Sequence, residues 1–193
     1  MMSRLVERVA ARSELRRGAS LLHPECPIEQ TVRAGDKAVQ AQLMQEIWRQ
    51  HGYVDDGALV VAEPKCLRVL ARTEGGLRAP VEALRRRYGG RLIVEPPAVR
   101  YVHGAPVLEP FMNVLASGPM RHFEEVQKDL GRRRGLLTRI DQHPDLFVLE
   151  AEAPLGHLLA YRADLDARFD GAVDVNLWLS RYCPIADGGP SAA

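Results

Sequence analysis

Two kinds of hydrophobic periodicity alternate along this chain, and the order in which they alternate constrains the fold more than any other feature of the sequence. Apolar residues at every second position predict half-buried strands, and apolar residues at every third or fourth position predict amphipathic helices. In the first half of the chain strands are predicted at 27–34, 58–62, 66–72 and 92–94, and helices at 36–51 and 77–88. The order is therefore β-α-β-β-α-β.

The same order returns in the second half of the chain. Strands are predicted at 110–116, 136–141, 147–153 and 173–180, and helices at 117–130, with Ser117 as the expected N-cap, and at 155–169. Two such units of about 75 residues each predict an α+β protein of two tandem ferredoxin-like (β-α-β-β-α-β) sandwiches. Each sandwich should have an antiparallel sheet with helices on one face.

Proline and glycine mark the boundary between the two units, in residues 96–106. The sequence thus predicts one ferredoxin-like domain at 26–100 and a second at 106–186. Residues 1–25 hold a thin apolar stripe among arginines, which predicts an N-terminal helical extension. The small and polar residues 187–193 predict a disordered tail.

Composition and overall charge place the chain among ordinary globular proteins. Of its 193 residues 46% are apolar, and 26 Lys and Arg offset 25 Asp and Glu, which argues against a disordered chain and a uniformly basic nucleic-acid binder. No segment has the ~20 consecutive apolar residues of a membrane span, and the N-terminus lacks the apolar core of a secretion signal. Three widely spaced cysteines do not suggest a disulfide framework. We therefore expect a cytoplasmic protein without a membrane partner.

The charges are unevenly distributed although they nearly cancel. Residues 140–193 carry three Arg against nine acidic residues, whereas 78–100 and 121–139 are basic. Two basic clusters stand at the ends of predicted helices: Arg85, Arg86 and Arg87, and Lys128 with Arg132, Arg133 and Arg134. Such side chains stabilise the helix dipole, but three adjacent guanidinium groups span the helix circumference, so at least one should face outward and be able to bind phosphates. The alternative is two solvated faces of opposite sign.

No catalytic or cofactor-binding motif emerges from the sequence. It contains neither a GxxxxGK[ST] phosphate loop nor the glycine-rich turn of a dinucleotide site. The six histidines never fall four residues apart on one helix and no CxxC occurs, so neither a metal site nor another cofactor is expected. Cys66 or Cys183 as a nucleophile would need a histidine within reach, and unreactive thiols are the favoured interpretation. We expect no enzyme activity.

Several short segments of the second unit together resemble a known domain. They are 108–112 (LEPFM), 126–135 (VQKDLGRRRG), 152–155 (EAPL), 161–165 (YRADL) and 180–184 (SRYCP). In order and spacing, through about 108–185, they resemble the C-terminal domain (domain V) of bacterial elongation factor G and related translational GTPases. Residues 27–100 more weakly resemble domain III of the same factors, chiefly in helix–strand order.

This resemblance implies a partner but no activity. The GTPase domain, the second domain and domain IV of those factors have no counterpart in the sequence, so GTP hydrolysis and translocation are not implied. In the family, domain V faces large-subunit rRNA and the stalk-base protein. The resemblance therefore implies a non-catalytic protein associated with the ribosome or a translation factor, with Arg132, Arg133 and Arg134 on the docking surface. The charge pattern adds Lys128, Arg85, Arg86 and Arg87.

A second class of function stays open. A regulatory, protein-interaction or small-ligand-binding module can keep this fold without binding the ribosome, because ferredoxin-like sheets host many functions. An open sheet face or edge of such a module can pair with a second copy and give a homodimer. Binding to ribosomes at low salt separates the two classes.

Overall fold

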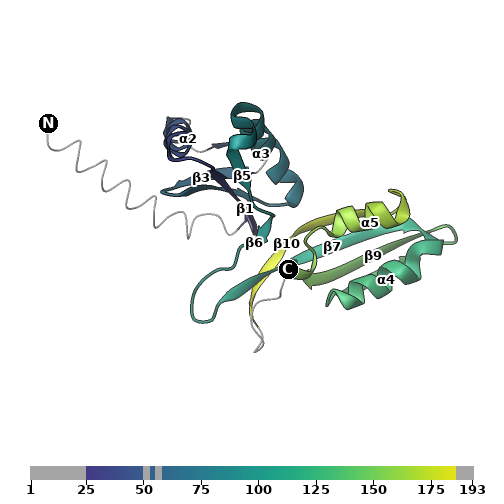
Figure 1. Ribbon diagram of the computed structural model, residues 1–193. Helices are drawn as coiled ribbons and strands as arrows, with labels where there is room; N and C mark the ends of the chain where they lie inside the picture. The colour runs from purple at the N-terminus through teal and green to yellow at the C-terminus, as the bar shows by residue number, and fades with distance from the viewer. Residues whose placement is uncertain (1–24, 50–52, 55–57, 186–193) are drawn as a thin grey trace.

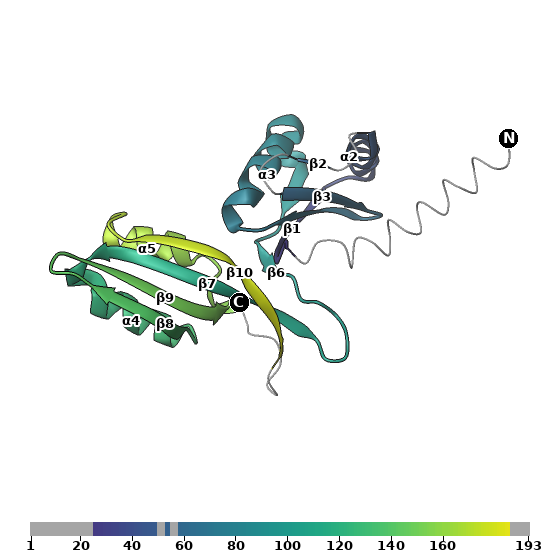
Figure 2. The same ribbon diagram turned by 180° about the vertical axis from the view of Figure 1, so that it is seen from behind.

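The computed structural model describes residues 25–49, 53–54 and 58–185, which form two sheets with helices packed on one face of each (Figure 1). Figure 2 shows the same two sheets and their helices from behind. The predicted C-terminal tail, and all but the last residue of the predicted N-terminal extension, lie outside the described residues. No helix among the described residues is long and apolar enough to cross a lipid bilayer.

The first unit contains one sheet with two α-helices. Its elements are β1 (Ile28–Ala34), α2 (Lys37–Arg49), β2 (Tyr53–Val54), β3 (Ala58–Glu63), β4 (Cys66–Ala71), α3 (Glu74–Tyr88), the 3₁₀ turn η1 (Gly89–Arg91), β5 (Leu92–Val94) and β6 (Ala98–Val99). The strands pair antiparallel in the order β2-β3-β4-β1-β5, and β6 pairs with β1 as well. The four neighbouring strands β3-β4-β1-β5 follow the strand order of a ferredoxin-like sheet.

Capping residues and apolar stripes explain where these helices lie. Asp36 accepts a hydrogen bond from the backbone N–H of Val39 at 2.7 Å, which fixes the start of α2 as the sequence predicts. The side chain of Thr73 caps α3, and Gly89, at φ 60°, ends it. The apolar stripe of α3 is buried against the sheet and consists of Leu77, Pro80, Val81, Leu84 and Tyr88.

The second unit repeats this arrangement without the extra strands. Its elements are β7 (Leu108–Pro119), the 3₁₀ turn η2 (Met120–His122), α4 (Phe123–Arg132), β8 (Leu136–Gln142), β9 (Leu146–Pro154), the 3₁₀ turn η3 (Leu155–His157), α5 (Tyr161–Phe169) and β10 (Asp174–Pro184). The strand order is β10-β7-β9-β8, and every pairing is antiparallel. This order, repeated in both sheets, confirms the predicted α+β class with tandem ferredoxin-like sandwiches.

Alternation along the strands places the core of the second unit between sheet and helices. Met112, Val114 and Ala116 of β7 point to the helical side, as do Phe147, Leu149 and Ala151 of β9, and all are buried. Phe123 of α4 packs its ring edge against Phe147, with 5.6 Å between ring centroids. The opposite face of this sheet carries no helix in the described part of the chain (Figure 2).

Two local predictions are wrong. Ser117 does not cap a helix: it lies inside β7, opposite Val148 and Asp174, because strand pairing continues to Pro119 and the helix begins only after η2. Residues 155–169 are not one helix, since Ala160 adopts a left-handed conformation (φ 60°) between η3 and α5. The backbone N–H of Ala160 is then free to bond outside its own helix.

Two glycines near the end of α4 should respond in opposite ways to alanine. A Cβ atom on Gly135 would lie 2.8 Å from the backbone oxygen of Leu130, so Gly135→Ala should lower the free energy of unfolding by about 1–3 kcal/mol. A Cβ on Gly131 meets nothing within 4 Å, so Gly131→Ala should raise it by about 0.5–1 kcal/mol through helix propensity. Urea denaturation followed by circular dichroism measures both, and equal effects of the two changes would contradict this account.

Candidate nucleic-acid interface

The first basic cluster lies on the exposed side of α3. Because Leu84 and Tyr88 face the sheet, Arg85, Arg86 and Arg87 occupy the remaining arc of the last turns, and all three are exposed. Arg87 lies over the ring of Tyr88, 5.9 Å from its centroid. This end of α3 therefore presents a basic surface.

The second basic cluster is divided by the structure. Lys128 and Arg132 on α4, and Arg134 just after it, are exposed. Arg133 is turned inward, with only 20% of its side chain exposed. Arg134 sits at φ 59°, so the chain reverses here to enter β8.

Arg133 holds the end of α4 against α5 and η3. Its Nε donates to Asp129 Oδ2 at 3.0 Å, one Nη donates to Asp164 Oδ2 at 2.7 Å, and the other donates to the backbone oxygen of His157 at 2.9 Å. The guanidinium carbon lies 4.6 Å from the centroid of the buried Tyr161 ring. We call these five residues the arginine clamp.

The charged groups of the clamp are paired inside the second unit. Asp129 is buried and accepts a second hydrogen bond, at 3.0 Å, from Arg168, which also pairs with Glu125 at 2.6 Å. Burial lowers the pKa of Arg133, but hydrogen bonds to Asp164 and Asp129 outweigh it and hold that pKa above its ordinary value. Arg133 therefore stays charged and engaged within the protein.

The structure thus assigns different surroundings to neighbouring arginines of one sequence run. At least one arginine facing outward was expected, and Arg132 and Arg134 both do so, whereas Arg133 serves the fold. The Asp129-to-Arg133 spacing of four on a helix is the one signal in the sequence that pointed to the clamp. The two basic clusters lie on different units, one on α3 and the other at the end of α4 (Figure 1).

Acidic residues of the second unit are largely paired with arginines of the same unit. Besides those of the clamp, Asp174 pairs with Arg162 at 2.7 Å and Glu152 with Arg181 at 2.5 Å. The acidic C-terminal stretch is therefore not a uniformly negative face.

No group of three or more His, Cys, Asp or Glu able to hold a metal ion occurs among the described residues.

A glutamate joins the two units. Glu74, in the first turn of α3, accepts from the backbone N–H of Ala160 at 2.9 and 3.1 Å through its two carboxylate oxygens. Burial raises the pKa of Glu74, and the bond to Ala160 offsets only part of that rise. The left-handed conformation of Ala160 is what directs this N–H towards the first unit.

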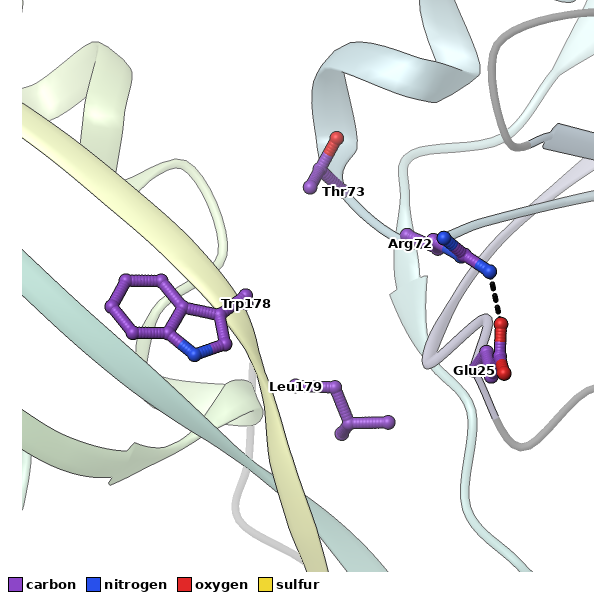
Figure 3. A pocket seen from close by; sticks show the side chains of 5 residues that line it. All are labelled: Glu25, Arg72, Thr73, Trp178 and Leu179. Atoms are coloured by element: carbon purple, nitrogen blue, oxygen red, sulfur yellow. Dashed lines mark hydrogen bonds and ion pairs between the residues drawn. The ribbon is translucent and has the colours of Figure 1, made fainter.

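Two grooves flank this junction, each with a volume of about 430 Å³. One runs between α3 and α5, and the basic residues that line it are Arg78, Arg85 and Arg162. The other lies between β10 and the start of α3. Figure 3 shows Trp178 and Leu179 leaving β10 on opposite sides, with Leu179 directed towards Arg72 and Glu25. Nothing in the sequence indicated either groove.

The second unit is similar in sequence to a domain of a translation factor. Residues 106–188 match the family model described as "Elongation factor G C-terminus". A 79-residue stretch is 34% identical to elongation factor G of Cytophaga hutchinsonii, and the match covers 41% of this chain and 11% of that factor. The second half of the chain is therefore an elongation factor G C-terminus-like domain, which confirms the resemblance to domain V.

A solved structure supports the wider fold. A crystal structure of a Thermus thermophilus protein superposes with a TM-score of 0.60 at 15% identity, over 85% of this chain and 41% of that one. At this identity the likeness concerns the fold alone. The resemblance of residues 27–100 to domain III stays a prediction.

Neighbouring arginines should differ sharply in their effect on stability. Arg133→Ala removes three hydrogen bonds and one of the two cationic partners of buried Asp129, and should cost about 2 kcal/mol of unfolding free energy. The matched change Arg132→Ala, at an exposed position, should cost less than about 0.5 kcal/mol. Urea denaturation measures the free energy of unfolding of both variants, and equal stability of the two would contradict the structural role of the clamp.

Glu74 should make folding pH-dependent in a defined direction. Its pKa in the folded protein is raised above 4.5, so the folded state binds this proton more tightly than the unfolded state does. The contribution of Glu74 to stability should be greatest below pH 4.5 and fall as the pH rises through its raised folded-state pKa. Glu74→Gln keeps an acceptor for the N–H of Ala160. As the pH rises through the folded-state pKa of Glu74, this variant should become more stable relative to the parent. Thermal unfolding from about pH 4 to 7 measures this, and a constant difference would refute it.

Proposed function

We propose that this chain is a non-catalytic, translation-related docking module that works in the cytoplasm. It binds phosphates of large-subunit ribosomal RNA, beside the stalk base, through the basic ends of α4 and α3. The observation that carries the proposal is the exposure of Arg132 and Arg134 on both sides of the clamped Arg133. The similarity of residues 106–188 to the elongation factor G C-terminus supports the choice of the ribosome as partner.

The arginine clamp supports binding by fixing the backbone between the two exposed arginines. Backbone N–H groups of residues 133–135 bond to carbonyls of Asp129, Leu130 and Gly131 at 2.8–3.2 Å, so the helix end is ordered before any partner arrives. A preorganised surface loses less conformational entropy on binding than a flexible one. From this ordered backbone the exposed guanidinium groups of Arg132 and Arg134 can contact phosphates bidentately.

The proposal includes a division of the chain into two domains. Residues 26–100 would correspond to domain III of elongation factor G and residues 106–186 to domain V. The ferredoxin strand order in both sheets supports this assignment.

Two of the three thiols, those of Cys66 and Cys26, support a non-catalytic role. Burial and the neighbouring Glu63, whose carboxylate lies 3.6 Å from Cys66 Sγ, raise the pKa of Cys66. Burial likewise raises the pKa of Cys26. Nucleophilic cysteines need the opposite shift, because the thiolate is the reactive form.

Sedimentation with ribosomes across a salt series tests the proposal. Binding should be strong at low salt and weaken steeply as salt rises, because phosphate contacts release counterions. The double variant Arg132→Ala/Arg134→Ala should weaken binding and lower the salt slope by about 1–2. Arg121→Ala, an exposed arginine before α4, is the matched control and should bind as the parent does.

Folded chain that fails to sediment with ribosomes at low salt would refute the proposal. Binding that the double variant leaves unchanged would refute the assigned surface. Capture of a translation factor in place of ribosomes would reassign the partner.

A further inference from the structure

Strand β8 forms an open edge of the second sheet. It pairs with β9 along one side, and no described residue pairs with its other side. Its seven residues therefore present a row of backbone donors and acceptors at the surface. The opposite edge strand, β10, lies beside the first unit (Figure 2).

Exposed apolar side chains concentrate on this edge. Among the described residues five large hydrophobic side chains are exposed, and three of them belong to β8 or to the start of β9 in the same hairpin. These three are Leu136 (67%), Ile140 (40%) and Leu146 (48%). An unpaired strand edge with such side chains is a typical site of strand addition.

The charges of β8 are self-complementary. Arg139 and Asp141 are two residues apart, so they lie on the same face of the strand, with 62% and 40% of their side chains exposed. Register places them opposite Glu150 and Val148, on the face without helices. Ile140, between them, lies opposite Leu149 and faces the helical side.

We propose that two copies of this chain pair antiparallel along β8, about a two-fold axis at Ile140. In this register Arg139 lies opposite Asp141 of the partner subunit, and Asp141 opposite the partner subunit's Arg139, which gives two cross-strand ion pairs. Ile140 meets Ile140 of the partner subunit on the helical side. The two sheets then form one continuous sheet, and the interface is isologous.

The same pairing brings the remaining apolar side chains together. Beyond the register shift between Leu137 and Arg139, Leu136 approaches the hairpin turn of the partner subunit, next to the partner subunit's exposed Leu146. Within each chain the Arg139–Asp141 pair, at 2.8 Å, is exposed and contributes little, so exchanging it for pairs between chains costs little. Arg132 and Arg134 come before β8 in the chain and are not among the paired residues.

A second copy fits this edge better than an unrelated strand does. Proteins blunt edge strands with charged side chains and bulges, and β8 has both, since its register shifts between Leu137 and Arg139. An unrelated strand that lacks an acid and a base in the matching order leaves Arg139 or Asp141 opposite a like charge or no charge. This difference favours a second copy of the chain over other strands. The same chain in reverse supplies that order by symmetry.

Sedimentation equilibrium of the 193-residue chain, from micromolar to near-millimolar concentration, tests the pairing. The parent should show a monomer–dimer equilibrium. Asp141→Arg or Arg139→Asp creates two like-charged pairs across the axis, and each should weaken the dimer by about tenfold or more. Circular dichroism and thermal unfolding should show both variants folded, because both positions are exposed.

Two rescue experiments distinguish the pairing from general surface effects. The double variant Arg139→Asp/Asp141→Arg exchanges the charges and should regain the parent dimer. An equimolar mixture of the two single variants should form a mixed dimer tighter than either variant alone.

A parent chain that stays monomeric at every concentration would overturn the proposal. So would a dimer that Asp141→Arg leaves unchanged, or a double variant no tighter than the single ones. The ribosome-binding test does not depend on these outcomes, because it measures a different partner with different residues.

Discussion

The buried carboxylate of Asp129 is the constraint on which the second unit depends. A charge in that position is tolerated only when it is paired and hydrogen-bonded, and Arg133 and Arg168 meet this requirement from the end of α4 and from α5. The pairing ties the end of one helix to the other, and it sets the turn at Arg134 and Gly135 from which β8 begins. The free edge of the sheet and the basic helix end are both positioned by this interaction.

A run of like charges in a sequence is therefore not a run of like roles. Arg132, Arg133 and Arg134 are adjacent, but the middle one is used by the fold and the outer two face solvent. The division has a structural effect, because the hydrogen-bonded guanidinium group of Arg133 fixes the backbone next to Arg132 and Arg134. Glu74 of the first unit bonds to the backbone of Ala160 in the second unit, and grooves lie beside this contact.

The sequence predicted most of the fold because periodicity reports directly on burial. Alternation in β7 and β9, and the stripe from Leu77 to Tyr88, identified side chains that the structure buries. It misplaced features that depend on distant contacts: Ser117 continues a strand because β9 and β10 pair with it, and Ala160 breaks a helix beside a bond to Glu74, 86 residues away. The clamp escaped prediction for the same reason, since Asp164 is 31 residues from Arg133. The basic helix ends, and an outward-facing arginine among them, were predicted from the sequence. Which arginine of the second cluster turns inward was not, because contacts of Arg133 with η3 and α5 decide it.

We propose that the exposed arginines beside the clamp bring this chain to the surface that elongation factor G occupies on the ribosome. A competition experiment tests this docking: labelled elongation factor G, held on ribosomes at fixed low salt, is titrated with this chain. The chain should displace the factor in proportion to its own binding, and added salt should abolish the displacement. Simultaneous binding of both, with the factor undisturbed at saturating chain, would contradict it.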